Sequence, residues 1–159
     1  MSDFPFDIPT VQPSSGGASG PAPAFHAVQT GHIQVQAGVK MGYNSITMGS
    51  DDFDGTFYTI PQDGLYQFNF SSFGGRIYPA TNADAQMLVD PVSGASDYVI
   101  GYYYETMNPS SGAVTGGFSM TSRLVKGDKV YMKTILGWAM FSFATGKSPC
   151  SFSGFYISP

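Results

Sequence analysis

Hydrophobic and polar residues alternate along most of this chain with a period of two, as they do in half-buried strands. The clearest example is the segment 65–71, in which Tyr66, Phe68 and Phe70 share one face and alternate with polar residues. A strand-like segment at 56–60 precedes it, and proline, aspartate and glycine supply turn chemistry between the two. The pattern predicts a β-hairpin over these residues.

The rest of the sequence continues in the same way, with glycine, proline, asparagine and aspartate between short apolar-polar runs. We expect further strands at 25–28, 32–37, 39–48, 85–89, 98–106, 117–125, 129–136, 138–143 and 150–157. Helix formers are scarce, with four leucines and one glutamate against 20 glycines, 11 prolines, 13 phenylalanines and 10 tyrosines. About ten short strands in one chain predict an all-β, ten-stranded jelly-roll sandwich.

The first 22 residues differ from the rest and predict an extended arm in front of a compact head at 23–159. Residues 11–23 form a Pro/Gly/Ser-rich linker that has nothing to bury. The segment in front of the linker alternates prolines and acids with three apolar residues, which we expect to anchor the arm on another protein chain: Phe4, Phe6 and Ile8. A disordered tail is the alternative, because chain termini are often unordered.

Charge is low, at 11% of residues, and the formal net charge is −4. The seven basic residues are scattered, whereas nucleic-acid binding needs a clustered basic surface, so we expect no nucleic-acid partner. A surface with so few charges predicts coverage by partner subunits or a protein lattice.

No apolar run approaches the roughly 18 residues of a membrane span, so we expect no membrane insertion. The first residues also lack the basic start and apolar stretch of a secretory signal. We expect either that a leader has been removed or that the protein does not use one.

Catalytic and metal-binding chemistry finds few candidates. The only histidines are His26 and His32, and no G-x-S-x-G elbow or His/Cys cluster is present, so we expect no enzyme and no zinc site. Three clustered acids suggest calcium, but they lack the spaced ligands and closing glutamate of an EF-hand loop: Asp51, Asp52 and Asp54. A solvated turn is the simpler interpretation, and we expect no cofactor, with calcium as a weak candidate.

The chain has one cysteine, Cys150, so no internal disulfide can form. Its position at the start of the last expected strand predicts a small buried thiol. A single cysteine does not indicate the redox compartment.

Four motifs, in order along the head, resemble the globular head of complement subcomponent one-q within the tumour-necrosis-factor-like jelly-roll superfamily. They are the opening strand Pro23–Ala27, the hairpin pattern of Phe53, Gly55, Phe57, Pro61, Gly64, Tyr66 and Phe68, the turn Leu124–Tyr131, and the closing pattern of Phe152, Gly154, Phe155 and Pro159. Gly154 interrupts the spacing of the closing phenylalanines, which predicts a bulge or a close strand approach. Two family features are missing: the asparagine-glycine after the middle strand, replaced by Asp90–Gly94, and the collagen stalk.

The resemblance implies a tight homotrimer, a closed ring in which each subunit buries one flank against its neighbour. The residues that we expect to pack the core or the trimer are Phe25, Phe57, Tyr66, Phe68, Tyr102, Tyr104, Phe152 and Phe155. In a strand Tyr103 faces away from Tyr102 and Tyr104, so only one of the two sets can enter the subunit's own core. The other set, with Met107 and Met120, is then available for packing between subunits.

We therefore expect a non-enzymatic trimeric module that works by binding. One hypothesis is a structural protein of a virion surface, a decoration or fibre-head protein that the arm fixes to another structural protein. The alternative is a secreted, extracellular lectin-like protein whose loops bind glycans or microbial surfaces. A cellular adhesion or cytokine-like module is a third possibility.

Overall fold

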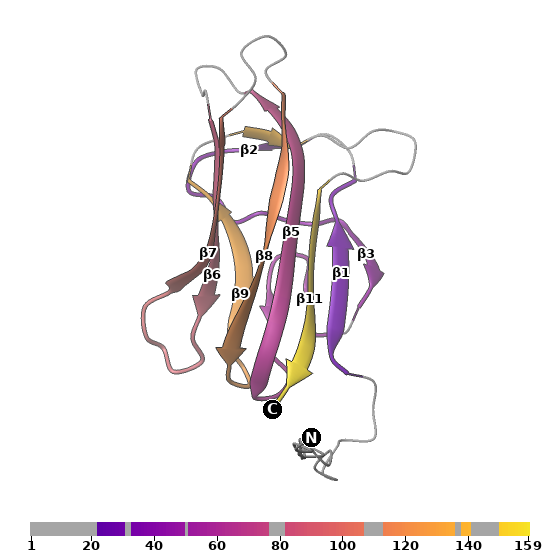
Figure 1. Ribbon diagram of the computed structural model, residues 1–159, viewed down its shortest axis with the longest axis vertical. Helices are drawn as coiled ribbons and strands as arrows, with labels where there is room; N and C mark the ends of the chain where they lie inside the picture. The colour runs from indigo at the N-terminus through magenta and orange to yellow at the C-terminus, as the bar shows by residue number, and fades with distance from the viewer. Residues whose placement is uncertain are drawn as a thin grey trace, which may run out of the picture.

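The computed structural model describes residues 22–30, 33–49, 51–76, 82–106, 113–135, 138–140 and 150–159, and the account below is restricted to them. They contain eleven strands and no helix (Figure 1). The strands are β1 (Ala24–Val28), β2 (Ile33–Val35), β3 (Ser45–Met48), β4 (Tyr58–Thr59), β5 (Gly64–Arg76), β6 (Asn82–Asp90), β7 (Tyr98–Thr106), β8 (Ala113–Leu124), β9 (Lys129–Thr134), β10 (Trp138–Met140) and β11 (Ser151–Ser158).

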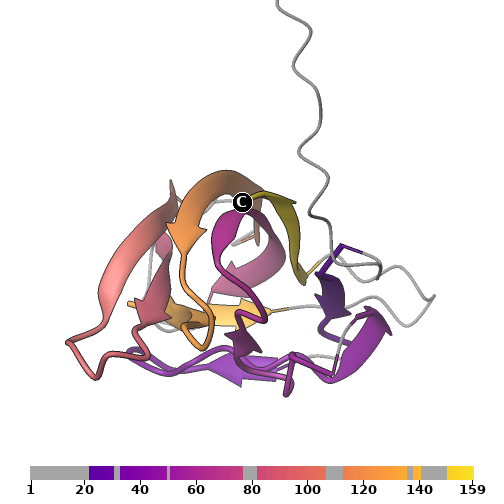
Figure 2. The ribbon, with the colours of Figure 1, turned by 90° about the horizontal axis from the view of Figure 1, so that it is seen from below.

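The strands form two antiparallel sheets that face each other as two layers (Figure 2). The seven-stranded sheet has the order β2-β10-β5-β11-β1-β3, and β8 pairs with β5 beside this path. The four-stranded sheet has the order β4-β9-β6-β7. The predicted all-β sandwich is confirmed, and three of its strands are only two or three residues long.

Two strands are shorter than the sequence pattern predicts. Within 56–60 only Tyr58–Thr59 forms a ladder, because the Asp54 carboxylate accepts the backbone N–H groups of Thr56 and Phe57 at 2.8 and 2.7 Å and holds them in a turn. Within 39–48 only Ser45–Met48 is a strand, and Tyr43 instead donates its backbone N–H to the carbonyl of Gly55.

Two strands that pair with each other are longer than predicted. β5 and β8 pair along twelve residue positions, from Gly64 opposite Leu124 to Gly75 opposite Ala113. The glycines and serines in the second half of β5 hid this continuation, because they carry little strand propensity of their own. Cross-strand pairing therefore extends both strands beyond their apolar segments.

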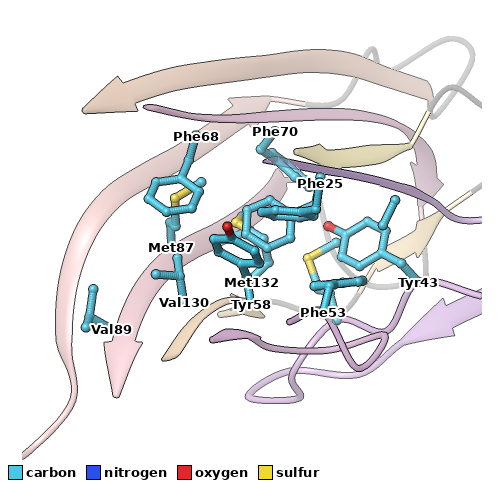
Figure 3. Packing of buried hydrophobic residues seen from close by; sticks show 14 of the residues in the cluster. Phe25, Tyr43, Phe53, Tyr58, Phe68, Phe70, Met87, Val89, Val130 and Met132 are labelled. Carbon is cyan, nitrogen blue, oxygen red and sulfur yellow. The ribbon is translucent and has the colours of Figure 1, made fainter. Parts of the chain in front are cut away.

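The core lies between the two sheets and is mainly aromatic on one side and aliphatic on the other (Figure 3). Phe25 stacks on Phe53 and Tyr58, with ring centroids 4.9 and 4.3 Å apart. Four residues that the sequence predicted for packing are fully buried here: Phe25, Tyr66, Phe68 and Phe152. Cys150 is also buried, as predicted.

Gly154 marks a close approach within the core, and the bulge lies elsewhere. The pairing of β11 with β5 runs without interruption through Gly154 and shifts only between Tyr156 and Ser158. A Cβ atom at position 154 would lie 2.6 Å from the Phe68 ring and 2.7 Å from the Phe25 ring. Glycine is therefore required there because two core rings occupy the space of a side chain.

The described chain begins and ends on neighbouring strands at one end of the sandwich (Figure 1). Ala24 of β1 lies opposite Phe155 of β11, and Tyr156 donates its backbone N–H to the carbonyl of Pro23 at 2.9 Å. The arm anchors Phe4, Phe6 and Ile8 lie outside the described residues. Within the described ranges, no helix is long and apolar enough to cross a membrane.

Candidate functional site

The outer face of the seven-stranded sheet is nearly free of charge across β8, β5, β11 and β1. We call this surface the uncharged face. Three successive rows of paired residues, of which all but the buried Val28 are at least partly exposed, cross the four strands without a lysine, arginine, aspartate or glutamate: Thr121–Gln67–Phe155–Ala24, Ser119–Asn69–Ser153–His26 and Gly117–Ser71–Ser151–Val28.

Side-chain hydrogen bonds connect neighbouring strands of the uncharged face. The Ser119 hydroxyl donates to Asn69 Oδ1 at 2.6 Å, and the hydroxyls of Ser71 and Ser151 lie 2.8 Å apart. Between β1 and its neighbour β3, His26 Nδ1 is 2.6 Å from the hydroxyl of Thr47. Amides and hydroxyls thus take the positions where a solvent-facing sheet usually carries charges.

Apolar residues border this face at the end of the molecule where the chain terminates. Phe155 and Ile157 of β11 point outward and are exposed. Phe155 therefore lies outside the subunit's core, on a surface where a partner could cover it. On β8, the charged residue nearest to these rows is Arg123, which lies opposite Leu65 of β5.

β7 and β8 form one side of the sandwich, and each is the last strand of its sheet. Side chains close the space between them: a Cβ at Gly101 of β7 would meet the Phe118 ring and, at 3.1 Å, the Met120 sulfur of β8. In return, the Tyr103 ring of β7 lies over Gly116 of β8. In the described structure, neither strand has a further ladder partner on this side, so both present unpaired backbone groups.

The three consecutive tyrosines of β7 divide as the strand period predicts. Tyr103 is 4% exposed and packs edge-on against Phe70, with ring centroids 5.6 Å apart. Tyr102 and Tyr104 are 51% and 52% exposed. These two are the set left outside the core, on the outer face of the four-stranded sheet.

The four-stranded sheet carries a lysine between two aromatic rings on its outer face. Lys40 Nζ is 4.3 Å from the ring centroid of Phe57 and 4.4 Å from that of Tyr131. The Tyr131 hydroxyl donates to the Asp97 carboxylate, and burial together with this bond raises the pKa of Tyr131. We call this group the Lys40 cage. Phe57, predicted to pack the core or the trimer, belongs to this outer cluster.

A second tyrosine–carboxylate pair lies on the same face. Asp84 of β6 is directly opposite Tyr104 and is 6% exposed. The Asp84 carboxylate beside Tyr102 raises the pKa of the Tyr102 hydroxyl. One carboxylate oxygen of Asp84, Oδ1, is buried without a hydrogen-bond partner.

The acidic loop forms a turn. One oxygen of Asp54 already accepts two backbone N–H groups, and Asp52 uses its backbone carbonyl to accept the N–H of Thr59. In the part of the chain that the structure describes, no three metal-binding side chains come together, Asp51, Asp52 and Asp54 included.

Sequence reasoning found the core aromatics but missed the uncharged face, the Lys40 cage and Asp84. A signal for the first was present, because Gln67, Asn69, Ser119 and Ser153 all alternate with apolar residues that enter the core. The Lys40 cage joins residues far apart in the sequence, so only the fold brings it together. The apolar neighbours of Asp84 in the sequence gave no indication of its role.

Comparisons with known proteins support the architecture. No family model matches the sequence, and curated proteins give no match. Solved structures do match: the globular domain of zebrafish complement 1qA protein has 19% identity and a TM-score of 0.63, covering 85% of this chain and 97% of that one. The Eiger TNF of S. frugiperda has 8% identity and a TM-score of 0.67, covering 87% and 94%.

Murine APRIL is similar to the same extent, with 10% identity, a TM-score of 0.65 and coverage of 86% of this chain and 100% of that one. At these identities the likeness concerns the fold. The chain therefore has the jelly-roll fold of complement one-q heads and tumour-necrosis-factor-like proteins, as its motifs predicted.

Proposed function

We propose that the protein is a non-enzymatic homotrimeric binding module in which the uncharged face packs against a neighbouring subunit. The observation that carries this proposal is the absence of charge from three successive rows across β8, β5, β11 and β1. Depletion of charged residues is the compositional mark of the centre of a protein interface. A trimer also agrees with the fold that the comparisons identify.

The side of the sandwich formed by β7 and β8 supplies the complementary surface. Its two terminal strands have unpaired backbone groups, and Tyr98 and Val99 add exposed apolar side chains at the start of β7. Packing this side against the uncharged face of the next copy joins two different surfaces. Such a heterologous contact closes into a ring when the rotation between copies is one third of a turn.

The chemistry of the described polar residues supports binding rather than catalysis. Asp63 accepts the backbone N–H of Lys126, and Asp128 accepts those of Val125 and Val92. His26 contacts a threonine. These groups stabilise turns and strand contacts on separate elements, instead of converging on one reacting atom.

Sedimentation of the purified full chain tests the assembly. We expect a species with three times the subunit mass at micromolar concentration. A folded chain that sediments as a single subunit, with the circular dichroism of a β-protein, would reject the trimer.

For the role of this trimer we propose attachment to a virion surface through the arm, as a decoration or fibre-head protein. The arm's prolines and apolar residues suit an extended peptide that binds another structural protein. In a three-fold ring three such arms start from equivalent positions beside β11. Three weak contacts on one particle then act together, which increases avidity without any new contact.

Deleting residues 1–20 tests this role. The shortened chain should remain a folded trimer and lose its attachment to the particle. Attachment that survives the deletion would reject the arm as the anchor.

A second candidate is a secreted lectin-like protein, and the same uncharged face favours it. Gln67, Asn69 and Ser119 present amide and hydroxyl groups that exchange hydrogen bonds with sugar hydroxyls if no subunit covers them. A glycan array probed with the full chain would then show binding that Asn69→Ala removes. An array without signal would count against this candidate.

A further inference from the structure

The Lys40 cage shows how this protein holds a cation on the outer face of its four-stranded sheet. Two aromatic rings contact the ammonium group, at 4.3 and 4.4 Å from their centroids. The hydroxyl of one ring, Tyr131, is hydrogen-bonded to the carboxylate of Asp97. Rings that attract a cation with their faces and a carboxylate beside them form a complete binding site for a positive group.

Tyr102, Tyr104 and Asp84 repeat this composition on β6 and β7 of the same sheet. Tyr102 faces outward opposite Gln86, and Tyr131 faces outward opposite Leu88, two residues further along β6. As in the Lys40 cage, a carboxylate lies beside a tyrosine, here Asp84 beside Tyr102. Within the described part of the chain no cation contacts the rings of Tyr102 or Tyr104 and no ion pair involves Asp84.

The Asp84 carboxylate lacks one hydrogen bond that it needs. Its Oδ1 atom is buried and has no partner, whereas buried carboxylate oxygens are normally paired. The two tyrosines beside it are half exposed on a terminal strand, and exposed side chains change rotamer within nanoseconds. A donor from outside can therefore reach the oxygen when these side chains move.

From these observations we infer that Asp84, Tyr102 and Tyr104 form a binding site for a guanidinium group, an arginine side chain of a partner protein. A guanidinium is planar, stacks on aromatic faces and donates two parallel hydrogen bonds to a carboxylate. It thus satisfies Oδ1 and both rings at once. The site lies on the outer face of the four-stranded sheet, beside the side of the sandwich that the proposed subunit contact uses.

A lysine beside the proposed site, Lys133, affects the affinity of the site for a cation. Lys133 lies opposite Gln86 in the same row as Tyr102, much as Lys129 lies 5.7 Å from the Phe57 ring beside the Lys40 cage. Its positive charge opposes the binding of a second cation. Removing this charge should therefore strengthen the binding of a guanidinium group. It should weaken the binding of a ligand that accepts a hydrogen bond from Lys133.

Nuclear magnetic resonance of the full chain with ring-labelled tyrosines tests the site, with N-acetyl-arginine amide as the probe and N-acetyl-citrulline amide as its uncharged isostere. We expect saturable shifts of the Tyr102 and Tyr104 signals with the arginine probe and none with citrulline. Asp84→Asn should weaken the affinity about tenfold or more. Lys133→Gln should increase it severalfold.

Asp90→Asn is the matched control, because Asp90 lies on the same strand opposite Lys129 and outside the proposed site. It should leave the affinity unchanged. If Asp84→Asn fails to fold by circular dichroism, Tyr104→Leu takes its place and should weaken binding severalfold. Equal binding of arginine and citrulline, or equal effects of the two Asp variants, would overturn the inference.

A second copy of the chain is a separate source of the same group, because Arg123 is exposed on β8. If the wild type binds the probe only after Arg123→Gln, a neighbouring copy already fills the site. That result would overturn the inference that the bound arginine belongs to a different protein.

Discussion

The two outer faces of the sandwich differ in charge, although both belong to antiparallel sheets of one small domain. Three rows across β8, β5, β11 and β1 contain amides, hydroxyls and small apolar groups. The other face carries Lys129, Lys133, Asp84 and Asp90 on two adjacent strands. Sheets that face water usually keep charges because charges prevent association through faces and edges. The difference supports the proposal that the uncharged face packs against a neighbouring subunit.

A charge in the middle of the uncharged face should give the largest effect. In Ser153→Lys the new ammonium group would be buried without a partner in the proposed subunit contact, at a cost of about 3–5 kcal/mol. We expect the trimer to dissociate in analytical ultracentrifugation at micromolar concentration. Gln86→Lys on the other face is the control and should sediment like the wild type; a three-subunit Ser153→Lys protein would contradict the comparison.

Close packing beneath the uncharged face predicts the next effect. A methyl group at Gly154 would overlap the rings of Phe25 and Phe68, so Gly154→Ala should lower the free energy of unfolding by about 1–3 kcal/mol. Gly42 has no atom within 4 Å of its ideal Cβ position, and Gly42→Ala should change the free energy of unfolding by less than about 1 kcal/mol. Urea denaturation of both variants makes the measurement, and equal losses would contradict the packing argument.

A tyrosine on the inner side of the seven-stranded sheet predicts a pH effect. Burial raises the pKa of Tyr66 to about 12 from 10, and its hydroxyl donates to the carbonyl of Gln62 at 2.8 Å. The raised pKa favours the folded state below pH 10, and this contribution is lost as the pH rises from 10 towards 12. Tyr66→Phe should lose about 1 kcal/mol at pH 7 and show a shallower decline of unfolding free energy above pH 10. Parallel pH curves for the two proteins would exclude this role.

The smallest effect should come from the Lys40 cage on the charged face. Lys40→Met removes the cation from two aromatic rings but keeps a side chain of similar length, so we expect a loss of about 0.5–1 kcal/mol. Lys129 Nζ lies farther from an aromatic ring, 5.7 Å from the ring centroid of Phe57, so Lys129→Met should cost less. Thermal unfolding of the two variants at low salt gives the comparison; a larger loss for Lys129→Met would contradict the assigned geometry.

Much of the fold could be predicted because its local signals agree. Apolar alternation marked β5, β7 and β11, and the turn glycine Gly127 adopts the positive φ of 93° that its turn requires. The period of two also assigned Tyr103 to the core and its neighbours to the outside. The ends of β5 and β8 could not be predicted, because cross-strand pairing rather than residue type extends them.

The surfaces were harder to predict than the core. An uncharged face exists only when four strands from distant parts of the sequence are placed side by side, which no single segment reveals. Asp84 has alanines on both sides in the sequence, and its burial follows from its tyrosine neighbours on β7. The arm residues Phe4, Phe6 and Ile8 lie outside the described structure, and their anchoring role stays a prediction.

The pairing of Ala24 with Phe155 has a practical consequence for building with this domain. A reporter fused before β1 and a reporter fused after β11 would both be attached at the same end of the sandwich, because the first and last strands are antiparallel neighbours. A short peptide that joins β11 of one copy to β1 of the next would lie at that end only. Three copies encoded as one polypeptide could then be produced with the opposite end of each sandwich unobstructed.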